Sequence, residues 1–565
     1  MPKRSEKERV LVLCALPYTN AVPHIGNMVG SHLPADIFAR FCRLKGAETL
    51  FVGATDENGT PTEVAALELG ITPKELTDVL HRVHRDIYSW FEISYDNFSR
   101  TSSPTHHRTT QEFFLEVNKN GFVSEGVMRL PYCEKDRIFL PDRYVEGTCP
   151  VCGYELARGD QCERCATLLD PIQLINPRCK VDGSVPVFKD SKQLFLELGK
   201  VQDRLERWIG SKKKWRTQVT SLAQGWIKEG LKKRSITRDL RWGVPIPLDG
   251  YRDKVFYVWF DAPVGYVSAT KEWGARQGNE GAWKKFWLDS DTRIYNFLGK
   301  DNIPFHTIFW PGMLMAHGKI NLPYDVVGLQ FCNYEGDKIS KSRNWGIFCE
   351  NIPQAGLDPD IWRYYLIQII PETRDTEFKW EDFKSKVNNE LVANIGNFIH
   401  RTTTFTWNNF EGEVAADPAP DGKELIREAG ALAAQTQELL DEVRFRDSLS
   451  RILAIADLGN EYFQRNQPWL LVKTDRARCE AVLHACLELC IAISILLQPF
   501  LPRSSEKILG LLGAEPRLGD LGKPHRKIKL ASRPEIPFKK LEDSQIELAK
   551  SMTTRSKPVG EYFRR

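Results

Sequence analysis

The chain has 565 residues, of which 42% are hydrophobic, 27% are charged and 11% are aromatic. A single hydrophobic core does not grow to this length, so about two to four domains are expected. The composition is that of a globular protein and excludes a fibrous fold or extensive disorder. The formal net charge of +4 is too small to indicate a nucleic-acid partner by itself, so an RNA would have to meet local basic patches.

Two short basic runs are candidates for such patches, Lys212–Arg216 and Lys232–Arg234. Short runs of this kind are also typical of solvated helix faces, and taken alone they favour that interpretation. The basic runs therefore support an RNA partner only if other features point the same way.

The sequence predicts a cytoplasmic protein. No run of about 18 apolar residues is present, so no membrane-spanning helix is expected. The charged residues 1–9 and the short apolar stretch Val10–Leu16, which ends at Pro17, make a poor secretory signal. Most of the 13 cysteines are then expected to be reduced and packed in the core. The exception is a cluster between residues 133 and 179.

Residues 1–125 read as the first half of a doubly wound parallel sheet. A short apolar run at residues 9–15 suits a buried strand, and a helical stretch follows from about residue 24 to 45. A second buried strand is predicted at residues 49–54, with a helix around residues 61–69. This alternation of strand and helix is typical of an α/β fold.

The alternation stops near residue 126 and resumes a hundred residues later. Residues 126–225 begin with a short, Cys- and Gly-punctuated segment, which favours a small insertion held by metal. Residues 226–325 then contain two further strand-like runs, at residues 255–260 and 295–299. We expect these runs to complete the same sheet, so that the insertion splits the α/β domain in two.

Residues 386–535 are predicted to form an all-α bundle. Apolar residues recur there at intervals of three and four, and Pro468 and Pro499 interrupt the pattern. The helical segments are expected at Asn388–Trp407, Lys423–Arg444, Asp447–Asn466 and Arg476–Leu497. The remaining residues, 536–565, are polar, and we expect a frayed tail.

The segment at residues 15–27, ALPYTNAVPHIGN, lies where the first strand gives way to a helix. The crevice at the carboxyl ends of parallel strands is where such sheets bind ligands, and a helix start offers N–H groups to phosphate. His24 and Asn27 share one face of the first helical turn, and Gly26 lets a flat ring approach the backbone. A single histidine before a helix is more often structural, so this segment alone is weak evidence.

A second segment, residues 337–343 or DKISKSR, has the composition of a flexible cationic loop. Lys338, Ser340 and Lys341 could be carried onto a triphosphate as charge builds up during phosphoryl or nucleotidyl transfer. A solvated surface loop has the same composition, so this segment alone also decides nothing.

Together, the two segments resemble the paired HIGH and KMSKS motifs of class I aminoacyl-tRNA synthetases in order and separation. Over residues 8 to 510 the chain resembles methionyl-tRNA synthetases, with details typical of the archaeal and eukaryotic branch. The matching stretches include CALPYTN, GATDENGT, ITRDLRWGVPIP, FYVWFDAPVGY and GKDNIPFHT. The resemblance implies a split Rossmann-like domain with a zinc-knuckle insertion, a KMSKS-loop and stem-contact region at residues 326–385, and a helical anticodon-binding bundle.

The resemblance also implies the reaction. ATP, L-methionine and tRNA(Met) would give methionyl-tRNA(Met), AMP and pyrophosphate through a methionyl-adenylate, with Mg²⁺ accompanying ATP. By the same resemblance Asp56 pairs with the α-ammonium of methionine and Asp301 reads the ribose. The other methionine-binding residues would be Ala15, Leu16, Tyr18, Trp259, Ala262, Tyr266 and His306. ATP would meet His24, Gly26, Asn27, Lys338, Ser340 and Lys341, with His24, Asn27, Lys338 and Lys341 acting in catalysis.

Two positions depart from the family motifs. Asn27 stands where the first motif ends in histidine, and an asparagine can donate a hydrogen bond but cannot carry positive charge. Ile339 stands where the second motif has methionine, which exchanges one apolar side chain for another. The first departure is the one that puts the nucleotide site in question.

The cysteine cluster predicts a structural zinc site. Cys149 and Cys152 form one CxxC pair and Cys162 and Cys165 another, with nine residues between the pairs. Four thiolates suit tetrahedral zinc and leave no position open for water, so the role would be structural. Two-knuckle relatives have four further cysteines where this chain reads Cys133, Asp136, Cys179 and Asp182. A Cys2Asp2 site is possible there, but a lost or weakened second site is favoured.

In the helical domain the resemblance identifies four residues as readers of the tRNA anticodon: Asn397, Arg401, Pro468 and Trp469. Asparagine and arginine read base edges and tryptophan stacks on unpaired bases, which suits a single-stranded loop. On sequence alone, a tryptophan that covers the bundle would explain Trp469 as well.

Two other interpretations remain. A class I synthetase for valine, isoleucine or leucine would carry a large hydrolytic insertion, and a cysteine enzyme would hold zinc at its amino-acid pocket. A noncatalytic, zinc-stapled RNA-binding protein on the same fold is the alternative from a different class, opposed by His24, Asp56, Lys338 and Lys341. No dimerising domain is recognisable after residue 535, so a monomer is expected.

Overall fold

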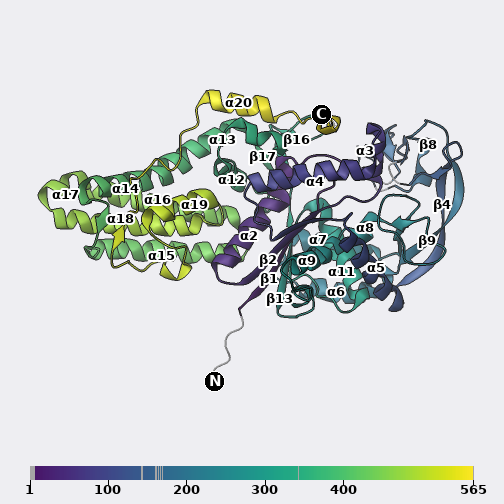
Figure 1. Ribbon diagram of the computed structural model, residues 1–565, viewed down its shortest axis with the longest axis horizontal. Helices are drawn as coiled ribbons and strands as arrows, with labels where there is room; N and C mark the ends of the chain where they lie inside the picture. The colour runs from purple at the N-terminus through teal and green to yellow at the C-terminus, as the bar shows by residue number, and fades with distance from the viewer. Residues whose placement is uncertain are drawn as a thin grey trace, which may run out of the picture.

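The computed structural model describes residues 7–141, 144–159, 162, 164, 165, 167, 169–341 and 343–563. Its centre is a parallel sheet with the strand order β14-β13-β1-β2-β3. Strands β1, β2 and β13 of this sheet are labelled in Figure 1. The strands are β1 (Arg9–Cys14), β2 (Glu48–Thr55), β3 (Asn97–Arg100), β13 (Thr292–Gly299) and β14 (Asp325–Leu329). The predicted α/β fold and the strands at residues 9–15, 49–54 and 295–299 are confirmed.

Strand order reverses between β1 and β13, which pair in parallel with Val12 opposite Tyr295. From this pair the chain runs outward to β3 on one side and to β14 on the other. The loops that leave β1 and β13 therefore diverge and open a crevice at the carboxyl ends of the strands, where such sheets bind ligands.

The side chains of β1 alternate between two buried clusters. Val10 and Val12 belong to a cluster with residues of α2 (Leu33–Leu44), whereas Leu11 and Leu13 belong to another with residues of α5 (Pro104–Lys119) and α9 (Val264–Arg276). The period of two residues along a strand explains this alternation, and helices on both faces explain why β1 reads as a continuous apolar run.

One predicted strand is wrong. Of residues 255–260, only Val255–Phe256 form a strand, β12, which pairs with β11 (Thr237–Arg238) outside the central sheet. Val258–Asp261 form the short helix α8. A short apolar run fits a buried strand or a buried helical turn equally well, and the pattern cannot separate the two.

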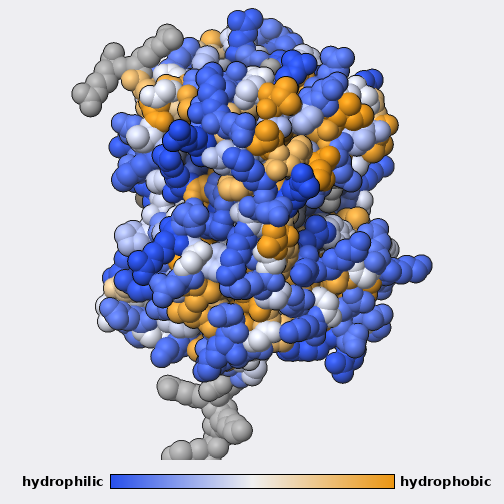
Figure 2. Space-filling model, turned by 90° about the vertical axis from the view of Figure 1, so that its right-hand side faces the viewer, coloured by the Kyte–Doolittle hydropathy of each residue, from blue (hydrophilic) through white to orange (hydrophobic). Residues whose placement is uncertain are grey.

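The insertion is built on a long antiparallel hairpin of β4 (Val123–Cys133) and β9 (Val187–Leu196), extended by β10 (Arg234–Ser235). A smaller sheet of β6 (Val145–Thr148), β7 (Ala157–Arg158) and β8 (Ile175–Cys179) carries the cysteine cluster. The hairpin end of the molecule shows hydrophobic patches among hydrophilic residues (Figure 2). Exposed apolar side chains in the insertion include Val127, Val151, Ile172 and Val185.

The all-α bundle is confirmed at residues 397–512. Its helices are α14 (Asn397–Phe410), α15 (Pro420–Asp441), α16 (Phe445–Asn466), α17 (Pro468–Thr474), α18 (Arg476–Leu497) and α19 (Pro502–Leu512). Among the described residues, α18 alone is long and apolar enough to cross a membrane, and 94% of its apolar window is buried inside the bundle.

The last segment of the chain is not the frayed tail that its polar composition predicts. Helix α20 (Asp543–Thr553) buries Ile546 and Ala549 and runs along α13 (Trp380–Lys386) (Figure 1). The 3-10 turn Val559–Phe563 then packs beside Leu76 and Leu80 of α4 (Pro73–Trp90). A few apolar anchors at wide spacing hold this segment, and such anchors leave no periodic signal in the sequence.

Candidate active site

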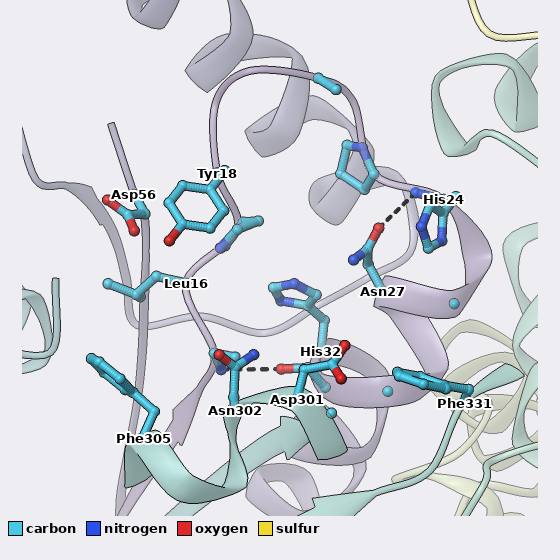
Figure 3. A pocket seen from close by; sticks show the side chains of 18 of the residues that line it. Leu16, Tyr18, His24, Asn27, His32, Asp56, Asp301, Asn302, Phe305 and Phe331 are labelled. Carbon is cyan, nitrogen blue, oxygen red and sulfur yellow. Dashed lines mark hydrogen bonds between the residues drawn. The ribbon is translucent and has the colours of Figure 1, made fainter. Parts of the chain in front are cut away.

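A cavity of about 410 Å³ occupies the crevice at the carboxyl ends of the parallel strands. The loops after β1, β2 and β13 supply its walls (Figure 3). Lys338, Ile339 and Lys341 line it as well. All the predicted methionine and ATP residues except Ser340 line it: Ala15, Leu16, Tyr18, His24, Gly26, Asn27, Asp56, Trp259, Ala262, Tyr266, Asp301, His306, Lys338 and Lys341. Sequence analysis did not single out Asn302, Phe305, Gln330 or Phe331, which line the cavity too.

One end of the cavity is aromatic. The ring of Trp259 meets the ring of Phe305 edge-on, with centroids 5.6 Å apart. Tyr266 is buried, and its hydroxyl lies 2.9 Å from Nε2 of His306. An apolar, polarisable lining of this kind suits a thioether, because sulfur packs favourably against aromatic rings.

His306 is neutral and its tautomer is fixed by its neighbours. Burial lowers its pKa to about 4. Nδ1 lies 3.1 Å from the carbonyl oxygen of Asn302, which can only accept, so Nδ1 carries the proton. Nε2 must then accept the hydrogen bond from the hydroxyl of Tyr266. The aromatic end therefore holds a satisfied polar pair without any charge.

Two buried carboxylates lie beside this end. Asp56 is 3% exposed and Asp261 is fully buried. Burial, reinforced by the negative charge of Asp261, raises the pKa of Asp56 well above its usual value. One oxygen of each carboxylate has no hydrogen-bond partner among the described residues, while the other oxygen of Asp261 accepts from Asn58 Nδ2 at 2.6 Å. Two buried carboxylates of like charge favour a nearby cation, and their unpaired oxygens need hydrogen-bond donors. An ammonium group supplies both the positive charge and the donors.

The opposite end of the cavity starts at α1 (Ile25–Asn27), capped by His24. Asn27 Oδ1 accepts from the backbone N–H of His24 at 3.0 Å, and the side-chain nitrogen of Asn27 faces the cavity (Figure 3). Asn27 thus stabilises its own turn and still offers a donor to a ligand.

Two details of this turn differ from the expectation. The N–H groups of Ile25 and Asn27 donate to the carbonyls of Ile347 and His24 at 3.0 and 2.9 Å, so these two are not free to bind phosphate. A Cβ at Gly26 would lie 2.9 Å from the imidazole of His24. Gly26 therefore makes room for the side chain of His24 itself.

The loop that carries Lys338 and Lys341, which we call the lysine loop, provides positive charge at the same end of the cavity. Lys338 lies on β16 (Asp337–Lys338), which pairs with β15 (Cys332–Tyr334). Lys341 lines the cavity and is exposed. Loss of hydration lowers the pKa of its ammonium to about 8, although the negative charge of Glu350 opposes this shift. Burial and the nearby Lys341 lower the pKa of His24 to about 3. His24 is thus a neutral hydrogen-bonding group.

Ser340 holds the loop together instead of lining the cavity. Its N–H donates to the carbonyl of Trp345 at 2.8 Å, and Trp345 N–H returns a bond to Ser340 at 2.9 Å. Ser342 of the same motif lies outside the described residues. On the far side of the cavity, burial raises the pKa of Asp301, although Lys338 and Lys300 oppose this.

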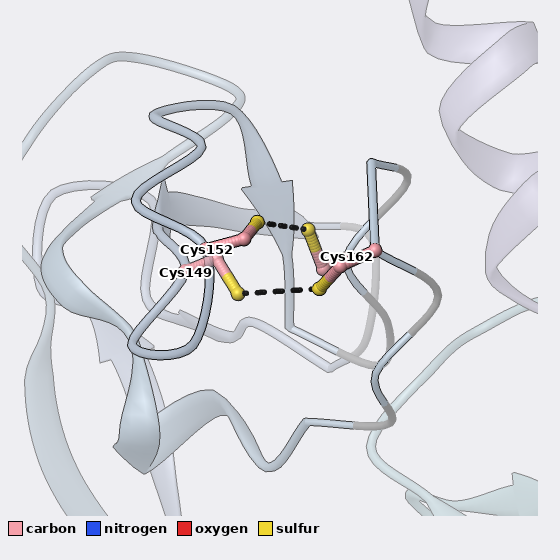
Figure 4. Close-up of side chains that lie close together, drawn as sticks. Cys149, Cys152 and Cys162 are labelled. Atoms are coloured by element: carbon pink, nitrogen blue, oxygen red, sulfur yellow. Dashed lines mark hydrogen bonds between the residues drawn. The ribbon is translucent and has the colours of Figure 1, made fainter.

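The four cysteines of the predicted knuckle come together as expected. Cys149 and Cys165 place their sulfur atoms 3.8 Å apart and Cys152 and Cys162 place theirs 3.5 Å apart (Figure 4). Four sulfurs at about 2.3 Å from one tetrahedral metal would be spaced by about 3.8 Å. The donor set and its spacing therefore fit zinc. Cys133, Asp136, Cys179 and Asp182 also gather, with ligand atoms within 4.8 Å of one another.

The four predicted anticodon residues belong to α14 and α17, and α17 lies at the end of the bundle away from the central sheet (Figure 1). The guanidinium of Arg401 lies 4.3 Å from the ring of Phe463, whose centroid lies 6.3 Å from that of Trp469. Trp469 is 38% exposed and Asn397 is exposed, whereas Pro468 is buried and begins α17. The exposed members form a surface with an aromatic face and polar groups beside it.

Fold and cavity together define a class I aminoacyl-tRNA synthetase. The sequence model of the family described as tRNA synthetases class I (M) matches residues 10–403, and that of the anticodon binding domain of methionyl tRNA ligase matches residues 414–552. The chain belongs to the methionyl family of class I tRNA synthetases.

Individual relatives agree with this assignment. The methionine–tRNA ligase of Thermococcus kodakarensis is 46% identical over 527 residues, which cover 90% of this chain and 70% of that protein. The cytoplasmic enzyme of Mus musculus is 43% identical over 89% of this chain and 56% of its own. The Mycobacterium tuberculosis methionyl-tRNA synthetase in complex with methionyl-adenylate superposes with a TM-score of 0.77 at 25% identity, covering 94% of this chain and 100% of that chain.

Proposed function

We propose that the protein is a methionine–tRNA ligase that joins L-methionine to tRNA(Met) with ATP, for protein synthesis. The observation that carries this proposal is one cavity in which an aromatic end, the buried carboxylate of Asp56 and two lysines lie together. A thioether, an ammonium and a triphosphate are the three parts that such a cavity can receive at once.

Methionine would lie with its side chain against Trp259 and Tyr266 and its α-ammonium at Asp56. The raised pKa of Asp56 favours a protonated carboxyl in the free protein. The methionine ammonium would replace that proton and donate to the carboxylate oxygen that lacks a partner. Ala15, Leu16, Tyr18, Ala262 and His306 complete this end of the pocket. The methionine carboxylate is then directed toward the nucleotide.

ATP would lie between the His24 turn and the lysine loop, with Asp301 accepting from the ribose. A carboxylate oxygen of methionine attacks the α-phosphorus, the bond to the β-phosphate oxygen breaks, and pyrophosphate leaves. Lys338 and Lys341 stabilise the charge that builds up on the leaving group, and His24 and Asn27 donate hydrogen bonds. Mg²⁺ bound with ATP supplies further positive charge. A terminal ribose hydroxyl of tRNA next attacks the adenylate carbonyl and releases AMP.

The insertion would hold one structural zinc ion on Cys149, Cys152, Cys162 and Cys165. Their sulfur spacing supports this, and thiolate ligands require the reducing conditions expected of the cytoplasm. In the second group, Asp136 and Asp182 replace softer thiolates, so we propose weaker binding there or none. Zinc analysis of the purified protein tests this, and about two tightly held zinc ions per chain would contradict it.

Asn397, Arg401, Pro468 and Trp469 would bind the anticodon, since an exposed aromatic face with polar neighbours suits unpaired bases. The enzyme as a monomer stays a prediction, which sedimentation in solution checks.

The deciding experiment is amino-acid-dependent exchange of pyrophosphate into ATP. Methionine should support exchange, and valine, isoleucine, leucine and cysteine should not. Exchange with one of these other amino acids would refute the methionine assignment, and no exchange with any of them would favour a noncatalytic RNA-binding protein.

A further inference from the structure

Helix α4 contributes a histidine to the candidate active site that belongs to neither of the two motifs. His84 lines the cavity and is 1% exposed. It lies in a buried stripe of α4 with Leu76, Leu80 and Tyr88, in which each residue is about one helical turn from the next. Of these four residues only His84 lines the cavity. The ionisable ring in this stripe therefore faces the site.

The surroundings of His84 fix its charge and its tautomer. Nε2 lies 2.9 Å from the carbonyl oxygen of Ala21, which can only accept, so Nε2 carries the proton. Burial lowers the pKa of His84 to about 3, although the bond to Ala21 opposes this shift. The ring is therefore neutral near neutral pH, and Nδ1 is a bare acceptor. Because Ala21 lies in the loop between β1 and His24, the bond at Nε2 also holds the loop that leads into the first motif.

Nδ1 of His84 is buried and has no hydrogen-bond partner among the residues that the structure describes. A buried acceptor without a donor costs free energy, so a donor is expected to reach this nitrogen. The phosphate groups of ATP present acceptors only and cannot supply one. An ammonium group carries three donors, so it can serve the imidazole and phosphate oxygens at the same time.

Lys341 carries the ammonium that can fill this role. Its positive charge lowers the pKa of His84 and also that of His24, and all three residues line the same cavity. No carboxylate within the described part of the chain forms an ion pair with Lys341, although Glu350 raises its pKa. A neutral imidazole can hold the ammonium without cancelling its charge, whereas a carboxylate would neutralise it.

We propose that His84 is a positioning residue for the activation step: Nε2 holds the loop before His24, and Nδ1 accepts a hydrogen bond from the ammonium of Lys341 and keeps it directed at the triphosphate. This inference rests on the proposed function, since it concerns the same cavity and the same reaction. The ammonium keeps two N–H groups for phosphate oxygens, and its full charge stays available as charge builds up on pyrophosphate. His84 acts through Lys341 and through the loop, so it need not touch the reacting atoms.

Three substitutions at this one position separate the two nitrogens. The amide of His84→Asn takes the place of Nδ1 but is too short to reach Ala21, whereas the amide of His84→Gln takes the place of Nε2. His84→Phe keeps a ring and removes both polar groups. The readout is the pH–rate profile of methionine-dependent exchange. Loss of the acceptor disfavours the charged form of Lys341, so its pKa falls and the basic limb moves to lower pH.

The basic limb should move to lower pH in His84→Phe and His84→Gln and should stay near its wild-type position in His84→Asn. His84→Phe should also lower kcat by about tenfold or more, the effect of one hydrogen bond to a charged group. Its KM for methionine should change by less than about twofold, because the aromatic end of the cavity is untouched. Ser89→Ala, at an exposed position of the same helix, is the control and should match the wild type. An unmoved basic limb in all three His84 variants would overturn the proposal, since a merely structural histidine gives that result.

A measurement on the wild-type protein covers the case in which the variants misfold. With a pKa of about 3, His84 does not titrate near pH 8, so Nδ1 should show no transition of its own there in ¹⁵N NMR of histidine-labelled protein. If Nδ1 accepts from Lys341, its resonance should follow the deprotonation of that ammonium, whose pKa is about 8. Lys341→Gln should abolish the transition and so assign it.

The other titratable groups around the ring cannot produce this transition. Burial lowers the pKa of His24 and His32 to about 3 and that of His81 to about 4. Burial also raises the pKa of Tyr88 and Cys349 well above their usual values. A resonance that stays constant while Lys341 loses its proton would overturn the proposal. This test needs no substrate, so absence of methionine-dependent exchange would refute the proposed function and leave the NMR result standing.

Discussion

The hydroxyl of Ser556 donates a hydrogen bond of 3.0 Å to Oε1 of Glu350 and so bonds the last part of the chain to the segment after the lysine loop. The N–H of Lys557 donates to the same oxygen at 3.2 Å, and the N–H of Phe348 donates to the carbonyl of Thr553 at 2.9 Å. On its other side the Glu350 segment bonds to the His24 turn, with Cys349 N–H donating to the carbonyl of Pro23 at 3.0 Å. The C-terminal segment thus braces the pairing of the two catalytic motifs.

Replacing Glu350 by glutamine should narrow the pH range of the exchange reaction. The pKa of Lys341 is lowered to about 8, chiefly by loss of hydration, and the negative charge of Glu350 opposes this. Without that charge the pKa falls further, so Lys341 loses its proton at a lower pH and the basic limb of the pH–rate profile moves down. Ser556→Ala should shift the limb in the same direction by less, because it frees Glu350 without removing its charge.

The control is Ser551→Ala, since Ser551 is exposed on α20 and donates only within its own helix, to the carbonyl of Leu548. An unchanged basic limb in Glu350→Gln, with normal folding, would contradict the link between Glu350 and Lys341.

Asp56→Asn should raise KM for methionine by about a hundredfold or more, because a buried ammonium would lose its anionic partner. The raised pKa of Asp56 adds a pH effect. Below that pKa the carboxyl is protonated in the free enzyme, so methionine must displace a proton and its affinity falls as pH falls. Calorimetry in buffers of different ionisation enthalpy should detect this proton release in the wild type and not in Asp56→Asn.

Trp469→Ala should reduce tRNA charging by about tenfold or more, which is the loss expected when one base loses its stacking partner. Exchange with methionine should stay normal, because α17, which carries Trp469, lies at the end of the bundle away from the central sheet (Figure 1). Leu470→Ala is the matched control, since Leu470 is the next residue and is 50% exposed. Equal loss of charging and exchange would rule out an anticodon role for Trp469.

Cys149→Ser should release the zinc and lower the melting temperature of the insertion, since structural zinc contributes directly to folding. Cys133→Ser, in the mixed cysteine and aspartate group, should leave the zinc content at about one ion per chain. Metal analysis and calorimetry of both variants test this pair of outcomes. A fall in zinc content in Cys133→Ser would show that the second group holds metal firmly.

Arg363→Leu should destabilise the whole protein by about 3 to 5 kcal/mol, the usual result of breaking a buried ion pair from one side. Arg363 is fully buried, donates to the carbonyls of Phe91 and Phe500, and lies 2.8 Å from Asp36. It therefore joins α2, the bundle and the α/β domain at one point. Denaturant unfolding measures the loss, and a change below about 1 kcal/mol would contradict this account.

The same variant should alter the pH dependence of stability. Burial favours a higher pKa for Asp36, but Arg40 and Arg363 outweigh it and hold that pKa below the usual value. A carboxyl with a lowered folded pKa contributes stability above its unfolded pKa, and this contribution is lost as pH falls through the folded pKa. In Arg363→Leu the folded pKa of Asp36 lies closer to the unfolded pKa, so the acid loss should be smaller and should be complete at a higher pH.

Hydrophobic periodicity predicted the sheet and the bundle. The paired motifs, with the family resemblance, predicted most of the residues that line the cavity. The run at residues 255–260 misled because apolar content does not distinguish a strand from a helical turn. Sequence analysis did not foresee that Gly26 also makes room for the imidazole of His24. Asp261 and Phe305 lay inside matching stretches, but only the fold shows that they face Asp56 and Trp259. The role of Ser556 depends on a contact across 206 residues, which no local pattern encodes.

Trp259 lines both the candidate active site and a second cavity, of about 740 Å³, between the insertion and the α/β domain. Engineering the enzyme to accept bulkier methionine analogues would naturally begin by trimming this indole. Such a substitution would join the amino-acid pocket to this second cavity. Water could then reach the methionyl-adenylate, which is a reactive mixed anhydride. Redesigns that keep a large, flat side chain at this position, and make room at Phe305 or Leu16 instead, should preserve the yield of charged tRNA per ATP consumed.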